Sequence, residues 1–205
     1  MPFKTDQVAR DIVLHRYVLP ECLHVPIAAL SEGAITTYIG DVAQVLATGT
    51  PNKAFLVQAK QPPPIDDRLP IWEVEGAAVL HRRSQVWVHV GYTRYRNAYR
   101  RAFPTEEIAG KVLSHAMNRR VAALKGFQYV RLTPVSRGAN SSSGFTEKWS
   151  VDLHGAPGQT QETARHSAFI QYADLADLLL MMDVNLGGGV MSVVNEGQAL
   201  VEPRL

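Results

Sequence analysis

Residues 85–133 read QVWVHVGYTRYRNAYRRAFPTEEIAGKVLSHAMNRRVAALKGFQYVRLT, and this stretch indicates how strands and helices alternate in the chain. Its two ends, 85–90 and 127–133, are rich in β-branched and aromatic residues, which is typical of strands. Between them, aromatic side chains at helical spacing predict a helix over 93–103, just before a proline. The stretch therefore predicts two strands that enclose helical segments.

A second and longer helix is predicted over residues 106–125. Gly126 would follow its last turn, as glycine does at many helix ends. On a helical wheel, most apolar side chains of this segment fall on one arc, and Arg120 falls near the middle of that arc. An arginine in an apolar arc predicts a structural ion pair with a buried acid, with clamping of an anion as the alternative.

His115 lies on the polar arc of that predicted helix, one turn from Lys111 and one turn from Arg119. Neighbouring positive charges favour the neutral form of a histidine. Neutral imidazole is the form that a general base or a metal ligand needs. His115 is therefore a candidate catalytic residue, and the alternative is a solvated histidine on a polar helix face.

The rest of the chain predicts further helices and strands around this stretch. The sum is an α+β fold, with a small mixed sheet of about five strands packed with five or six helices and amphipathic C-terminal helices. The proline-rich loop 61–70 predicts a boundary between an N-terminal helical segment, 1–60, and a basic α+β domain, 61–205. A single domain over 1–205 is the alternative. The other expected helices are 5–19, 27–46, 161–182 and 190–201, and the other strands 54–60, 72–80 and 149–153.

The charge of the chain is distributed unevenly along the sequence. Residues 82–137 hold twelve lysines or arginines and two acids, which gives a net charge of +10. The segment before them has six basic and nine acidic residues, and the segment after them three and eight. A cluster of positive charge attracts polyanions, so this pattern favours binding of nucleic acid.

The candidate phosphate contacts come from the basic segment. Arginines beside a stripe of aromatic rings on the helix 93–103 are typical of nucleic-acid binding, although such a stripe also serves as core packing. The small-residue loop 136–144, SRGANSSSG, is a candidate anion nest in which Asn140 contacts phosphate; a flexible surface loop is the alternative. The candidate nucleic-acid-binding residues are Arg94, Arg96, Arg100, Arg101, Lys111, Arg119 and Arg137.

The order of His115, Asn140 and His154 resembles that of the His-Me finger (HNH) nucleases, over about 40 of the 205 residues. The resemblance implies that His115 activates water, that Asn140 orients it and that His154 helps to hold a divalent metal at the cleaved phosphate. In that family the first histidine ends a strand, whereas His115 is predicted within a helix. No metal is identified by the sequence itself.

Three functions are therefore open. The first is a protein that binds nucleic acid, either RNA or DNA. The second is a metal-dependent nuclease with His115 as general base. The third is a self-assembling shell or coat subunit, in which acidic and basic segments of neighbouring copies pair in a homo-oligomer. The single cysteine, Cys22, and a polar opening segment predict a cytoplasmic protein that does not enter a membrane.

Overall fold

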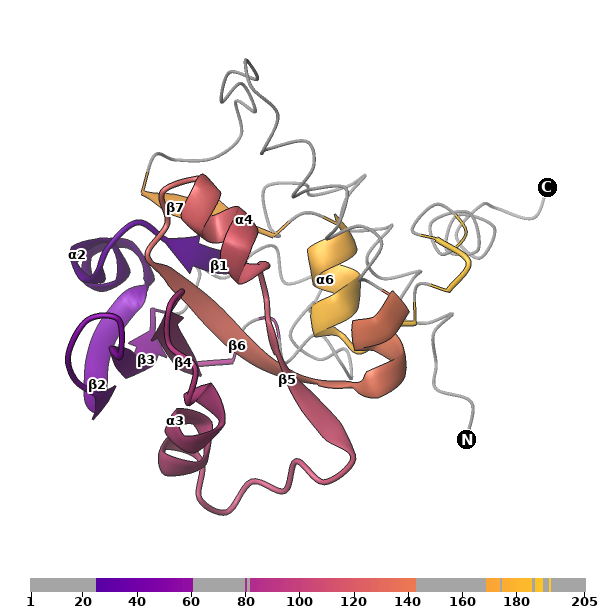
Figure 1. The fold of residues 1–205 in the computed structure, drawn as a ribbon, viewed down its shortest axis with the longest axis horizontal. Helices are drawn as coiled ribbons and strands as arrows, with labels where there is room; N and C mark the ends of the chain where they lie inside the picture. The colour runs from indigo at the N-terminus through magenta and orange to yellow at the C-terminus, as the bar shows by residue number, and fades with distance from the viewer. Residues whose placement is uncertain are drawn as a thin grey trace, which may run out of the picture.

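The computed structural model describes residues 25–60, 80, 82–142, 169–173, 175–185, 187–189 and 192. These residues form a seven-stranded antiparallel sheet with short helices around it (Figure 1). The strands are β1 (Pro26–Ala29), β2 (Gly40–Ala47), β3 (Ala54–Ala59), β4 (Ser84–His89), β5 (Lys111–His115), β6 (Tyr129–Ser136) and β7 (Ile170–Tyr172). The helices are α2 (Glu32–Ala34), the π-helix η2 (Ile35–Ile39), α3 (Tyr95–Ala102), α4 (Arg119–Leu124), α6 (Leu175–Met181) and a helical segment over 137–142.

The predicted fold class is wrong. The sheet has seven strands rather than five, all of its pairings are antiparallel rather than mixed, and the named helices that the structure describes have eight residues or fewer. The physical reason is that apolar residues at helical spacing also suit strands whose two faces are both buried. Pairing with distant segments then decides between the two structures.

Strand β6 is the centre of the sheet. The strand order is β2-β3-β4-β6-β1-β7, with β5 paired to β6 off this path. One edge of β6 pairs with β4, where Val86 lies opposite Leu132. The other edge is shared: β1 pairs with the first residues of β6, and β5 pairs with its second half, beginning where His115 lies opposite Leu132. His115 therefore lies where one partner of β6 ends and the other begins.

Both faces of the central strands are covered by apolar side chains. One face holds the larger core cluster, in which Val86 and Leu132 pack with Tyr99 of α3 and Leu179 of α6. The other face holds a smaller cluster around the fully buried Trp87. In the view of Figure 1, α4 lies above β6 and α3 below it, with α6 beside the helical segment that follows β6. Burial on both faces makes β4 and β6 a rigid platform for the surrounding elements.

The predicted helix over 27–46 is wrong, because that segment forms β1, the short turns α2 and η2, and β2. Ser31 accepts a hydrogen bond from the Ala34 amide and begins the helical turns. Gly40 begins β2, opposite Ala59 of β3. A Cβ atom at Gly40 would overlap the Gln58 carbonyl oxygen, so the close approach of the two strands requires glycine there.

The predicted helix over 106–125 is also wrong. Gly110 has φ of 76°, in the left-handed region, and it separates the preceding turn from β5. Five residues of β5 then pair with β6, from Lys111 opposite Ser136 to His115 opposite Leu132. Only α4 remains helical, and it ends at Gly126, which has φ of 84°. The glycine at the helix end was thus predicted correctly, but the helix before it is much shorter.

Three predicted elements are confirmed: strands 54–60 and 85–90 are β3 and β4, and helix 93–103 is α3. Strand 127–133 continues as β6 through Pro134 to Ser136, and the predicted loop 136–144 contains the helical segment 137–142. In the described part of the predicted helix 161–182, residues 170–172 form β7 and residues 175–181 are helical.

The predictions over 5–19, 72–79 and 149–153, and nearly all of 190–201, lie outside the described residues. Residues 61–70 lie outside them too, so the domain boundary there stays a prediction. Among the residues that are described, no helix is both long enough and apolar enough to cross a lipid bilayer.

Candidate functional site

A groove with a volume of about 480 Å³ lies beside β5. It is bordered by the first turn of α3, by strand β5, by the start of α4 and by the helical segment 137–142. The lining residues are Tyr95, Arg96, Val112, Leu113, Ser114, His115, Asn118, Arg119, Arg120 and Asn140. The described residues of this lining include three arginines and no carboxylate, so this part of the groove is cationic.

Strand β5 provides one wall of this groove. Among the described strands, β5 pairs with β6 alone, so its other edge is not paired to a strand. Its side chains alternate across the sheet, which places Leu113 in the larger core cluster and His115 on the same face as Leu113. This anchoring holds the wall in place while the histidine side chain lines the groove.

His115 is held in its neutral form. Burial, together with the positive charge of Arg119, lowers the pKa of His115 from 6.5 to about 4. Its ring meets the ring of Tyr95 edge-on, with the centroids 4.6 Å apart. The Nε2 atom is buried and has no hydrogen-bond partner among the described residues. A neutral imidazole with one unsatisfied nitrogen can accept or donate a proton to a group that enters the groove.

The arginines of the groove differ in how they are held. Arg119 donates from Nη1 to the Tyr92 carbonyl at 3.3 Å, and its guanidinium lies 5.9 Å from the ring centre of Tyr95. Arg96 and Arg120 are exposed, and neither guanidinium group has a hydrogen-bond or ion-pair partner in the described part of the chain. Thus one guanidinium is pre-positioned and two are free to bind an anion.

Asn118 joins the groove to the fold by capping α4. Its side-chain Oδ1 accepts hydrogen bonds from the amides of Arg120 and Val121, at 2.9 and 3.4 Å. An asparagine at this position satisfies amides that the first helical turn leaves unpaired. The cap therefore fixes the first turn of α4, and with it the direction in which the side chains of Arg119 and Arg120 extend.

The structure brings several of the predicted site residues into one groove: His115, Asn140, Arg96 and Arg119. Their roles stay predictions. They lie close together even though the predicted helix over 106–125 does not form. His115 ends a strand instead of lying within a helix. His154 lies outside the described residues.

The other predicted phosphate contacts lie outside the groove lining. Arg94 and Arg100 are exposed at the start and in the last turn of α3, and their guanidinium groups have no partner in the described chain. Arg101 donates to the Leu46 carbonyl at 2.9 Å, and Lys111 lies 3.9 Å from an Asp183 oxygen. Arg137 is exposed at the start of the 137–142 segment.

Sequence reasoning assigned no site role to Tyr95, Ser114 or Asn118, which also line the groove. The motif Asn-Arg-Arg-Val was the available signal, because an asparagine before a short apolar run is typical of a helix start. Arg120 also lines the groove; it was predicted to pair with a buried acid, with clamping of an anion as the alternative. With α4 beginning at Arg119, Arg120 is exposed in the first turn, and its guanidinium has no acid partner among the described residues.

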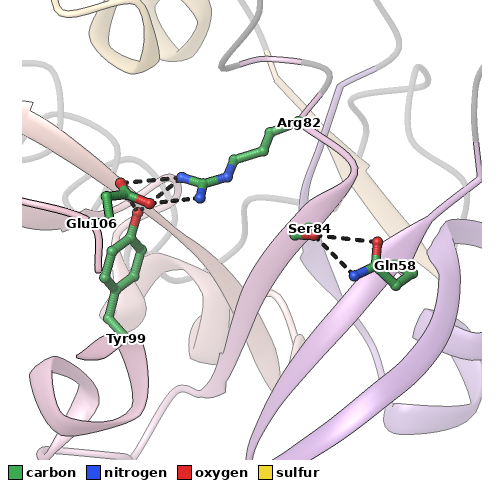
Figure 2. A network of polar contacts seen from close by, with 5 residues as sticks. All are labelled: Gln58, Arg82, Ser84, Tyr99 and Glu106. Carbon is green, nitrogen blue, oxygen red and sulfur yellow. Dashed lines mark hydrogen bonds and ion pairs between the residues drawn. The ribbon is translucent and has the colours of Figure 1, made fainter. Parts of the chain in front are cut away.

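A second polar cluster lies beside the sheet, and Figure 2 shows it close by. Arg82 binds Glu106 through both Nη atoms, at 3.2 and 2.6 Å, and the Tyr99 hydroxyl donates to the same carboxylate at 2.8 Å. The Arg82 guanidinium also lies 3.9 Å from the ring centre of Phe103. This cluster ties α3 to the turn that follows it and to the start of β4.

The charges in this cluster are satisfied internally. Burial by itself would raise the pKa of Glu106, but hydrogen bonds from Arg82 and Tyr99 outweigh burial and lower it. Burial also raises the pKa of Tyr99, so its hydroxyl stays protonated and donates. Nearby, Arg131 is almost completely buried and donates to the Leu80 carbonyl at 2.8 Å. We therefore assign this cluster to stability.

Among the described residues, no group of three or more His, Cys, Asp or Glu side chains is placed to hold a metal ion. A scan against protein-family models found no match for this chain, and searches of curated proteins and of solved structures found none either.

Proposed function

We propose that this protein binds nucleic acid through the groove beside β5 and the arginines around it. The observation that supports this best is the lining of the groove, where Arg96, Arg119 and Arg120 lie together and no carboxylate occurs among the described lining residues. Guanidinium groups bind phosphate oxygens through paired hydrogen bonds, and positive charge in a hollow raises the local concentration of polyanions.

The exposed arginines of α3 extend this positive surface beyond the groove. Arg94 and Arg100 have no carboxylate partner in the described chain, and Arg82 is the arginine of this region that an acid neutralises, through Glu106. An ion pair with a carboxylate would have neutralised the charges of Arg94 and Arg100. Their freedom supports a role in contacting a ligand with several negative charges.

The test uses Asn118, because a substitution there can introduce a negative charge and still keep the hydrogen bonds that cap α4. Asn118→Asp retains a capping oxygen but puts a negative charge between the groove arginines. We expect its affinity for labelled RNA or DNA to fall about tenfold, while its melting temperature stays close to that of the wild type. The matched control is Asn118→Ser, which caps without charge and should bind like the wild type.

Wild-type affinity should also fall steeply with salt, by a slope of about −0.7 per phosphate contacted on a single strand or about −0.9 on a duplex. The proposal fails if no RNA or DNA binds at low salt, or if Asn118→Asp binds as tightly as the serine variant.

Nuclease activity with His115 as general base is a second candidate. It is favoured by the neutral state of His115, by its unsatisfied Nε2 and by Asn140 in the same groove. Wild-type protein incubated with RNA or DNA and Mg²⁺, Mn²⁺ or Zn²⁺ should cut it. His115→Ala should abolish cutting while leaving affinity within about twofold, since a general base contributes to rate rather than to binding. Intact substrate under all three metals would exclude this candidate.

Self-association of the chain stays a prediction, because no observation on the described residues bears on it.

A further inference from the structure

The shape of the groove restricts which nucleic acid can enter it. The cationic side chains do not stand on a ridge; they surround a hollow between β5, the start of α3 and the start of α4. Proteins that read a duplex do the opposite, because they place a protruding helix or ribbon into a groove of the nucleic acid. A hollow suits a ligand that can itself be inserted, such as a flexible strand.

The volume of the groove sets the length of strand that it can hold. About 480 Å³ lies within the range of small-molecule sites, roughly 300–1,000 Å³, and corresponds to about one or two nucleotides. A double helix is far too wide for this space and would touch only its rim. The arginines that α3 and α4 contribute to the lining would then not reach the same phosphate group.

The remaining lining residues offer the contacts that an unpaired base needs. Tyr95 lies beside His115 at one side, and the planar guanidinium of Arg119 lies over the Tyr95 ring. Unpaired bases stack on such planar groups.

We propose that the groove binds single-stranded nucleic acid, with one or two nucleotides inserted between Tyr95, Arg96, Arg119 and Arg120, and that it excludes duplexes. This inference rests on the proposed function and specifies its ligand. The competing interpretation is that α3, with its exposed Arg94 and Arg100, binds the duplex from outside as a protruding helix.

The experiment compares two double variants of the full chain that lose the same charge. Arg96→Ala with Arg120→Ala removes two groove arginines, and Arg94→Ala with Arg100→Ala removes two arginines outside the groove. All four side chains are exposed, so both variants should keep the fold, which circular dichroism and thermal melting check. Fluorescence anisotropy at about 0.1 M KCl then measures binding of short labelled RNA and DNA strands, alone and annealed to their complements.

We expect the wild type to bind single strands at least about tenfold more tightly than duplexes, and the groove variant to lose at least about tenfold in single-strand affinity. The variant outside the groove should lose less than about threefold. Equal or tighter binding of duplexes by the wild type would overturn the inference without any variant. Equal losses from the two variants would overturn it as well, and would leave nucleic-acid binding itself standing. Absence of all binding would instead remove the proposed function and this inference with it.

Discussion

Acidification should unfold this protein partly through His115. The imidazole titrates at 6.5 in the unfolded chain but at about 4 in the folded one, because burial and the nearby Arg119 oppose its protonation. Between pH 6.5 and about 4, the unfolded state therefore binds a proton at His115 that the folded state does not bind. Stability from this residue is complete above pH 6.5 and is lost as the pH falls towards 4.

The size of the loss follows from these two values. Between pH 8 and pH 5, a pKa that changes from 6.5 to about 4 on folding costs about 2 kcal/mol of unfolding free energy. The assay is urea denaturation of the wild type and of His115→Leu at both pH values. Leucine cannot titrate, and it stays apolar beside Tyr95, so the wild type should lose about 2 kcal/mol more than the variant.

All other titrating groups are common to the two proteins, so the difference between them isolates His115. Nuclear magnetic resonance of the labelled imidazole checks the same point directly, with an expected midpoint near pH 4. A midpoint near 6.5, or equal acid sensitivity of the leucine variant, would refute the assignment of His115 as a buried neutral histidine.

The remaining predictions concern the sheet and the cluster in Figure 2. Glu106→Gln should destabilise the protein by about 1–3 kcal/mol in urea denaturation at pH 7, because it weakens charged hydrogen bonds to Arg82; Glu107→Gln, which alters an exposed side chain, should change stability by less than about 0.5 kcal/mol. Equal effects of the two would mean that the cluster adds no stability. Gly40→Ala should cost about 1–3 kcal/mol or more, because its methyl group would overlap a carbonyl of β3, whereas Gly33→Ala has ordinary space and should be neutral or slightly stabilising. A stable Gly40→Ala protein would show that β2 and β3 can separate at that point.

Local signals predicted several elements well. A buried apolar run identified β3, β-branched and aromatic residues identified β4, and aromatic spacing with a following proline identified α3. The glycine at 126 ends α4 as predicted, because a left-handed residue is needed there whatever the length of the helix before it. These features depend on neighbours in sequence, so a sequence contains enough information to find them.

The segment 111–115 shows where local signals are insufficient. Val112 and Leu113 suit an apolar helical arc and a strand equally well, and only pairing with β6, about twenty residues further along, selects the strand. The formation of the groove depends on long-range pairing in the same way. The residue types that suit phosphate binding were visible along the chain, and so was the excess of positive charge.

The sequence alone determined which chemical groups this protein has: a basic central segment, a histidine among cations and a set of turns and caps that are local by nature. The tertiary structure decided which of them meet. It separated Arg82, neutralised by Glu106, from Arg96 and Arg120, whose guanidinium groups have no partner in the part of the chain that the structure describes. It also brought Asn140 to the groove of His115. The reason is that strand pairing is a long-range interaction, whose register no local pattern of residues contains.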